Sequence, residues 1–470
     1  MSRGLAQSPS MLAGHGFGPL DVATSGAANP PESTRFGFIL FILINAVLLV
    51  RPGDLLPALD QVPIYETLMA ISIFASYRVI LAQLTWASLM SRPLTFCVIA
   101  LLPAIFLSNF SHGNLYDARL GAFAFFKVQL YFLLFVGLID SPFRFRVLLF
   151  VIVVLVTITA VLALLQWYHY IDLEALTPVG QWTEVDEETG ELGEMLRLQG
   201  PGILGDPNDF ALVLVSAMIL CAQFLFEQRR WLVKPLLLIP IGLMGYALGL
   251  TSSRGGLLSL ILGSVVVITC RLPWRRSVPL LLIVLPAFFV IFGGRQTNID
   301  LDDDEDTFQG RVILCRDALV LFHGAPIFGI GYNMMADENG TVAHNSYAHT
   351  YAELGLFGGT LFVGMIYLAV MAVYQLKPKT IRFKDDELRR WRSCVFAIVA
   401  AYALGIWSLS RPYAIPTYLV IAIVATYCNL ATTRPSPVLR GVNQSFFIRL
   451  GKAGIVCLIV LHVYVRLMLA

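Results

Sequence analysis

Apolar runs of about 20 residues recur along nearly the whole chain, and they constrain its fold more than any other feature. Each run is continuous and does not alternate, and a chain in lipid must satisfy its backbone polar groups within helices or a closed barrel. Charged residues make up only 14% of the 470 residues, against roughly 25% in a soluble domain. The runs lie near 36–50, 64–82, 94–109, 122–139, 146–169, 209–226, 231–250, 255–271, 278–293, 354–375, 393–410, 414–431 and 453–469.

This pattern predicts an all-α, polytopic membrane protein with 12–13 transmembrane helices. Residues 36–470 would form a single transmembrane domain, interrupted by two long loops at about 170–208 and 294–353. Residues 1–35 are polar and rich in Gly, Pro and Ser, which is typical of a disordered segment. No cleavable signal peptide is expected, because no short apolar core with a small-residue cleavage site lies near the start.

The distribution of charge predicts which way the chain crosses the membrane. With the N-terminus inside, the inner segments hold 23 of the 33 Lys and Arg residues, and the outer segments hold 24 of the 31 Asp and Glu residues. The positive-inside rule produces this asymmetry. We therefore expect the basic segment 377–392 to be cytoplasmic and both long loops to lie outside.

Two acidic segments in the outer loops are predicted to be solvated and to bind no metal. The run DLDDDED (300–306) resembles a series of calcium ligands, but a calcium loop of the EF-hand type needs Gly at its sixth position and Glu at its twelfth. Here those positions hold Glu305 and Arg311. The run EVDEETGELGE (184–194) is interpreted in the same way. Nucleic acid is excluded as a partner, because the basic residues lie where a membrane explains them.

Arginines on the acidic outer side are unexpected under the positive-inside rule, which suggests that they have a specific function. In RLQGPGILGDPNDFA (197–211), Asp206 or Asn208 is placed to cap the following helix, which leaves Arg197 unexplained. In TSSRGG (251–256) a serine caps a helix and Arg254 falls in its first turn, where the helix dipole disfavours a cation. Arg254 therefore calls for an anionic partner.

The stretch VAHNSYAHTYAELGLFG (342–358) places polar residues at the mouth of an apolar run. If a helix begins near Asn345, then His344, Tyr347 and Tyr351 share one face. An interfacial aromatic belt would account for the tyrosines but not for His344, whose imidazole accepts a proton near neutral pH. The glycines that follow would allow close helix contact; they are Gly355, Gly358 and Gly359.

These segments resemble the bacterial O-antigen ligase family and its relatives, the O-antigen polymerases and the O-linked protein oligosaccharyltransferases. The motif HN, nine residues, then GLFG (344–358) is similar to the signature of this family. Three further segments match in the same order: RLQGPGILGDPNDFA, TSSRGG and GRVILCRDALVLFHGAPIFGIGYN (310–333). The resemblance covers roughly 195–375.

The resemblance implies an architecture like that of the C-type multispanning glycosyltransferases, in the bacterial inner membrane with the site facing the periplasm. It implies metal-independent transfer of a glycan from undecaprenyl diphosphate to an acceptor hydroxyl, on lipid A-core or another glycan, without a cofactor. His344 would be the catalytic base, with Arg254 and Arg311 as catalytic partners. The residues expected to contact substrate are Arg197, Asn208, Asn345, Tyr347, Tyr351, Glu353, Arg119 and Lys127.

Three alternatives remain open at this point. The motifs do not separate a ligase from an O-antigen or exopolysaccharide polymerase, and a protein O-oligosaccharyltransferase is a third relative. A lipid-linked glycan transporter belongs to another class, and it would place paired broken helices and ionisable groups near the middle of the membrane. In this sequence the polar residues concentrate at the outer boundary, which favours a transferase.

Overall fold

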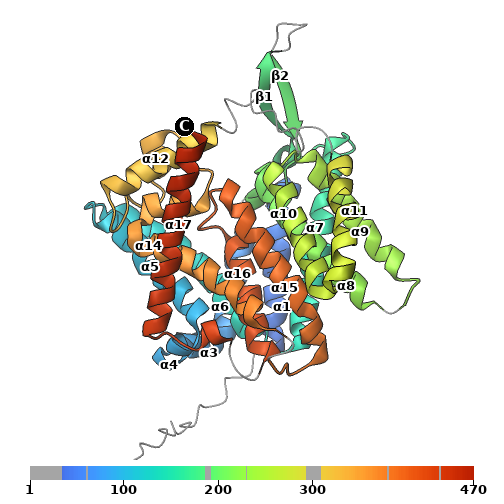
Figure 1. Ribbon diagram of the computed structural model, residues 1–470, viewed down its shortest axis with the longest axis horizontal. Coiled ribbons are helices and arrows are strands. Elements are labelled where there is room, and N and C mark those ends of the chain that lie inside the picture. The colour runs from blue at the N-terminus through green and yellow to red at the C-terminus, as the bar shows by residue number, and fades with distance from the viewer. Residues whose placement is uncertain are drawn as a thin grey trace, which may run out of the picture.

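The computed structural model describes residues 34–59, 62–185, 192–228, 230–292, 309–377, 381–432 and 436–469, and most of these residues are helical (Figure 1). The acidic run 300–306 lies outside the described residues. So does the segment predicted to be disordered, except for Thr34 and Arg35. The Thr34 hydroxyl accepts a hydrogen bond from the Gly37 amide and thereby caps the first helix.

In the part of the chain that the structure describes, nine helices are long and apolar enough to cross a membrane, which confirms the all-α, multi-pass prediction. They are α3 (Ile64–Leu84), α5 (Pro93–Phe110), α6 (Leu115–Leu138), α7 (Pro142–Trp167), α8 (Pro207–Glu227), α10 (Arg254–Arg271), α14 (Ser346–Gln375), α15 (Asp386–Gly405) and α17 (Gln444–Met468). Shorter apolar helices are α1 (Arg35–Val50), α9 (Lys234–Leu250) and α16 (Ile415–Ala431), and α11 (Trp274–Ile291) covers the run predicted at 278–293.

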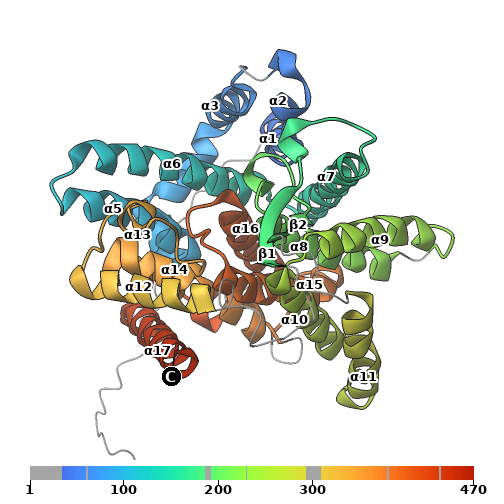
Figure 2. The ribbon, with the colours of Figure 1, turned by 90° about the horizontal axis from the view of Figure 1, so that it is seen from above.

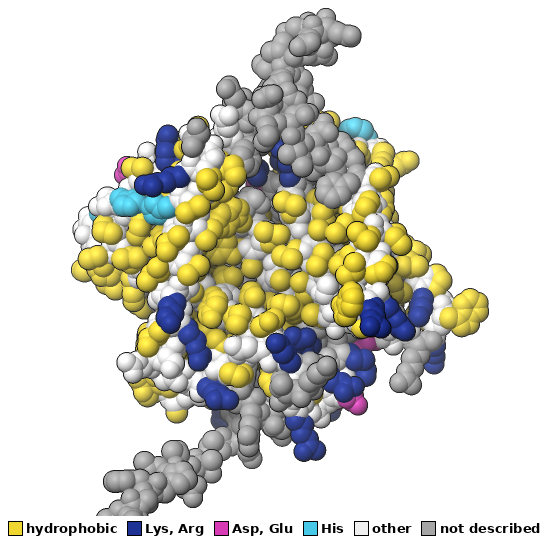
Figure 3. Space-filling view, viewed as in Figure 1, with side chains coloured by type: hydrophobic (Ala, Val, Ile, Leu, Met, Phe, Trp, Pro, Cys, Tyr) yellow, Lys and Arg dark blue, Asp and Glu magenta, His cyan; other side chains and the backbone are white. Residues whose placement is uncertain are grey.

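The helices surround a centre formed by α16 and its neighbours, as the view from above shows (Figure 2). Helix α16 packs against α6, α14 and α15, while α9 and α11 lie at the periphery. On one face of the molecule, hydrophobic side chains form a broad band with Lys and Arg side chains along its lower edge (Figure 3). A bilayer would cover such a band and leave the charged edge in the headgroup region.

The two long loops contain secondary structure that the sequence did not indicate. The first forms an antiparallel hairpin of β1 (Val179–Val185) and β2 (Leu192–Arg197), so the interpretation of 184–194 as a plain solvated loop is wrong where the structure describes it. The second contains α12 (Gly310–Gly324) and the short α13 (Met335–Asn339). Apolar and polar residues alternate in QWTEV (181–185), but this segment is too short and too polar to predict a strand from the sequence.

Helix α14 is broken at Gly355, whose φ of 61° and ψ of −159° are not helical. The segment 326–331 crosses this break and replaces the missing helical hydrogen bonds. Its amides at Ile330 and Gly331 donate to the carbonyls of Ala352 and Glu353, at 2.9 and 3.2 Å. Its carbonyls at 326 and 327 accept from the amides of residues 356 and 357, at 2.8 and 3.2 Å. The break therefore leaves these backbone groups satisfied, as an apolar surrounding requires.

Only glycine fits at this crossing. A Cβ on Gly355 would lie 2.4 Å from the Ile327 carbonyl oxygen, and one on Gly329 would lie 2.2 Å from the backbone of Glu353. The close helix contact expected at the GLFG glycines thus takes a different form at Gly355, where a loop and not a helix approaches.

We expect Gly355→Ala to destabilise the protein, because alanine is strained at this φ and its methyl group overlaps the Ile327 carbonyl. The strain alone costs about 1–3 kcal/mol. Thermal unfolding in detergent should show a clear drop in Tm. Gly451→Ala is the matched control, because a Cβ there meets nothing within 4 Å inside α17 and should leave Tm equal or higher. Equal Tm values for Gly355→Ala and wild type would contradict this account of the break.

Candidate functional site

The start of α14 is fixed by hydrogen bonds from two directions. The Asn345 side chain caps the helix, accepting from the amides of Tyr347 and Ala348 at 3.0 and 3.1 Å. The Ser346 hydroxyl donates to the Leu409 carbonyl at 2.5 Å and accepts from the Arg411 amide at 2.9 Å. The connection between α15 and α16 is thereby attached to the first residue of α14.

His344 directly precedes the cap and has a left-handed backbone, with φ of 47°. It therefore lies outside the helix, and the prediction that His344, Tyr347 and Tyr351 share one helical face is wrong. Left-handed backbone is uncommon outside glycine, and such positions cluster at functional sites. Its side chain is half-buried, which leaves the imidazole partly accessible.

The first turn of α8 connects the segments that carry Arg197 and Arg254. Asp206 caps this helix, and its carboxylate accepts from the Asn208 amide at 2.7 Å. The Asn208 side-chain oxygen accepts from Arg197 Nη2 at 2.9 Å and from the Ser253 hydroxyl at 2.8 Å. Ser253 in turn caps α10, whose first residue is Arg254. The turn thus connects the hairpin, α8 and α10.

The next residue of α8, Asp209, is buried and forms an ion pair with Arg411. The Arg411 side chain remains 42% exposed. Its Nε is bound to Asp209, and among the described residues its two terminal nitrogens make no hydrogen bond. Arg411 is thus oriented by one carboxylate and still presents donors outward.

Helix α10 also contacts the connection that carries Arg411. A Cβ on Gly255 would lie 2.3 Å from the Ser408 hydroxyl, so the helix start and this connection are in close contact. The glycine after Arg254 is therefore required for the approach. It brings Arg254 into the same region as Arg411.

Four helices, α8, α10, α12 and α14, begin around His344. The hydrogen bond between Asn208 and Ser253 joins α8 to α10, and Arg411 joins α8 to α14 through its contacts with Asp209 and Ser346. The charge of Arg311, the second residue of α12, acts on His344. Helix N-termini carry partial positive charge and donate free backbone amides, so they favour anions. The region contains four arginines and two aspartates; they are Arg197, Arg254, Arg311 and Arg411, with Asp206 and Asp209.

The surroundings lower the pKa of His344 below its ordinary value of 6.5. Burial is the largest cause, followed by the positive charge of Arg311, with smaller effects of Arg411 and His349 in the same direction; Asp206 opposes them. The imidazole is therefore neutral at pH 7 and able to accept a proton.

Three residues expected to contact substrate have buried side chains. The Tyr347 hydroxyl donates to the Ala403 carbonyl at 2.7 Å, and the Tyr351 hydroxyl donates to the Gly454 carbonyl at 3.2 Å. Glu353 is 1% exposed and lies 3.1 Å from His349 Nε2, while its other oxygen accepts from the Met335 amide at 3.3 Å. These side chains hold α14 to α13, α15 and α17, and so support the site from within.

Arg119 and Lys127 lie on α6, apart from this cluster. Lys127 Nζ is 3.8 Å from the Glu66 carboxylate of α3, and Arg119 lines an apolar cavity of about 590 Å³ between α5 and α6. Within the described residues no hydrogen bond or ion pair connects either side chain to His344 or Arg411. The structure does not bring them together with the catalytic candidates.

A comparison with known protein families gives a match to the part of the chain that contains His344. Residues 239–363 match the family model described as O-antigen ligase. Over these residues the chain is similar to the O-antigen ligases. The match covers Arg254, Arg311 and His344, and it confirms the family resemblance seen in the sequence. No curated protein matches the chain.

The matched segment, together with the candidate membrane spans among the described residues, supports a multi-pass membrane protein that is similar to O-antigen ligases over residues 239–363. Arg197 and Arg411 lie outside the matched residues, and Arg411 was not among the predicted site residues. The proximity of Arg411 to α8 and α14 depends on contacts between distant segments, which the sequence does not reveal.

We expect Arg197→Lys to destabilise the protein. Arg197 is only 9% exposed and donates to three acceptors, the Thr251 carbonyl and the side chains of Gln181 and Asn208, at 2.9 to 3.2 Å. A lysine cannot reach three such directions, and each lost bond to a charged donor costs about 1.5–3 kcal/mol. Thermal unfolding in detergent measures the loss.

Arg316→Lys serves as the control, because Arg316 is exposed on α12 and, among the described residues, pairs with its neighbour Asp317. That substitution should change the unfolding free energy by about 1 kcal/mol or less. If Arg197→Lys unfolds at the wild-type temperature, Arg197 does not hold the hairpin, α8 and α10 together.

Proposed function

We propose that the protein transfers a glycan from undecaprenyl diphosphate to an acceptor hydroxyl at the periplasmic face of the inner membrane, as an O-antigen ligase does. The observation that carries this proposal is the convergence of four helix starts and their arginines on a neutral, partly accessible His344. The site thus combines a base with a strongly anion-binding surrounding.

His344 acts as the general base. The acceptor hydroxyl attacks the anomeric carbon of the donor sugar, the bond from that carbon to the diphosphate oxygen breaks, and the hydroxyl proton passes to His344. A base positioned in this way contributes roughly 10²–10⁴-fold to the rate. The depressed pKa keeps the imidazole unprotonated, so it is ready for this step.

The arginines bind the diphosphate and stabilise it as it leaves. Arg254 and Arg311 lie at helix starts, where the backbone amides of the first turn also favour an anion. Arg411 adds two outward donors that Asp209 orients. Guanidinium groups form paired hydrogen bonds to phosphate oxygens, so they supply the charge stabilisation that a divalent metal provides in other transferases.

We expect His344→Ala to abolish transfer while the lipid-linked donor still binds, because a general base acts in the transition state. Arg254→Lys and Arg311→Lys should also lose transfer, with weaker donor binding, because an ammonium cannot reproduce the forked contacts of a guanidinium. The measurement is transfer by purified protein, set beside donor binding and the yield of folded protein.

Arg316→Lys, on the same helix as Arg311, is the control and should transfer at the wild-type rate. Folded His344→Ala protein with undiminished transfer would end the assignment of His344 as the base. Active Arg254→Lys and Arg311→Lys proteins would show that these arginines act only as charges at the headgroup.

The pH dependence should follow the protonation of His344. Since only the neutral imidazole accepts a proton and the pKa of His344 is lowered, kcat/KM should stay constant near pH 7 and fall only below pH 6.5. Asp206→Asn keeps the cap of α8 but removes a charge that raises this pKa, so the acid limb should move to lower pH. An acid limb above pH 7, or one that Asp206→Asn moves upward, would contradict the assignment.

Transfer should survive EDTA, because the arginines supply the charge stabilisation and the acidic run 300–306 lacks the spacing of a calcium loop. The assay is transfer by purified protein after exhaustive chelation. Loss of transfer that magnesium or calcium restores would overturn the metal-independent mechanism.

A further inference from the structure

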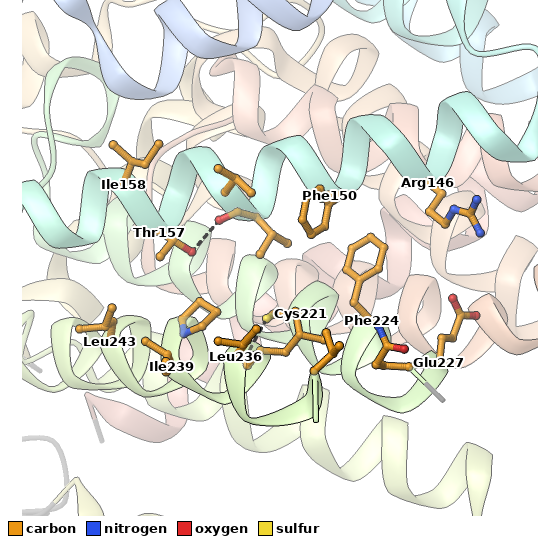
Figure 4. A pocket seen from close by; sticks show the side chains of 16 residues that line it. Arg146, Phe150, Thr157, Ile158, Cys221, Phe224, Glu227, Leu236, Ile239 and Leu243 are labelled. Carbon is orange, nitrogen blue, oxygen red and sulfur yellow. Dashed lines mark hydrogen bonds between the residues drawn. The ribbon is translucent and has the colours of Figure 1, made fainter. Parts of the chain in front are cut away.

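A second cavity lies between α7, α8 and α9, away from the candidate site (Figure 4). Its volume is about 660 Å³, within the range of sites that hold whole small molecules. Apolar side chains of α7 and α9 form its walls, among them Phe150, Val154, Ile158, Ile239 and Leu243. Phe150, Val154, Ile158 and Ile239 are exposed on the molecular surface, so the cavity is a groove that opens sideways.

The groove has one polar end. Arg146 and Glu227 lie there, and Ile158 and Leu243 lie toward the other end (Figure 4). Twelve residues of α7 separate Arg146 from Ile158, which is about 18 Å along a helix. The hydrocarbon core of a bilayer is about 30 Å thick, so the groove has roughly the length of one leaflet.

The polar end lies at the side of the molecule opposite to His344. Arg146 pairs with Glu387 at 3.1 Å, and Glu227 lies 3.7 Å from Arg390. Both partners belong to α15 near its start, which follows the far end of α14, whereas His344 precedes the beginning of α14. The groove therefore cannot place a headgroup within reach of the candidate catalytic residues.

The charge at this end favours an anion. In each of the pairs Arg146–Glu387 and Arg390–Glu227, the positive charge of the arginine is offset by the negative charge of the glutamate. Two further basic residues, Arg230 and Lys234, are exposed in the connection between α8 and α9 and at the start of α9. Together these groups leave an excess of positive charge where a lipid headgroup would lie.

We propose that this groove binds one anionic phospholipid of the leaflet on the basic side of the protein. An acyl chain fills the space along Phe150, Val154 and Ile158, and the phosphate lies near Arg230 and Lys234. The lipid completes the packing of α9, a peripheral helix that contacts α7 and α8. At its other end α9 leads to Thr251, whose carbonyl accepts from Arg197, so the lipid supports the helix that precedes Arg254.

The test is native mass spectrometry of the delipidated full-length protein, titrated in detergent with phosphatidylglycerol or with phosphatidylcholine. We expect one phosphatidylglycerol to be retained, with phosphatidylcholine about tenfold weaker or more, as two basic residues near a headgroup would produce. Val154→Trp fills the groove and should abolish retention. Arg230→Gln with Lys234→Gln should remove the preference between the two lipids while retention of a lipid persists.

Val460→Trp is the matched control, since Val460 is similarly exposed on α17, outside the groove. It should retain phosphatidylglycerol like the wild type. Undiminished retention by Val154→Trp, or equal loss in Val460→Trp, would overturn the location of the site. Equal retention of the two lipids by the wild type would overturn its preference for an anionic headgroup.

Discussion

The exchange of backbone hydrogen bonds across the break in α14 is the constraint on which the rest of the site depends. Segment 326–331 binds both sides of the break at Gly355, and the Ser108 hydroxyl of α5 donates to the Glu353 carbonyl beside it. The first two turns of α14 are therefore held separately from the remainder of the helix. Since Asn345 and Ser346 lie at the start of these turns, the break determines where His344 is presented.

The second constraint is electrostatic. Helices α8, α10, α12 and α14 bring four partially positive ends toward one region, and arginines add full charges there. Asp206 and Asp209 lie in the same region, and Asp209 orients Arg411. Helix starts and guanidinium groups both favour anions, which is why we propose a lipid diphosphate as the ligand of this region.

The sequence predicted the class of fold and the catalytic candidates, and it did so from patterns that are local. Continuous apolar runs indicated the helices, and the caps at Asp206, Ser253 and Asn345 were recognisable from residue type. It could not predict contacts between distant segments. Arg411 lies about 200 positions from its partner Asp209, and the buried roles of Tyr351 and Glu353 depend on helices packed from elsewhere in the chain.

The central claim is that the arginines and His344 form one binding site for a lipid diphosphate and its sugar. An experimental structure of the protein with an undecaprenyl-diphosphate glycan bound tests this most directly. We expect the diphosphate within hydrogen-bond distance of Arg254, Arg311 and the terminal nitrogens of Arg411, with the anomeric carbon next to His344. A diphosphate bound at the opposite end of the molecule, near Arg146, or one with its sugar out of reach of His344, would contradict the account.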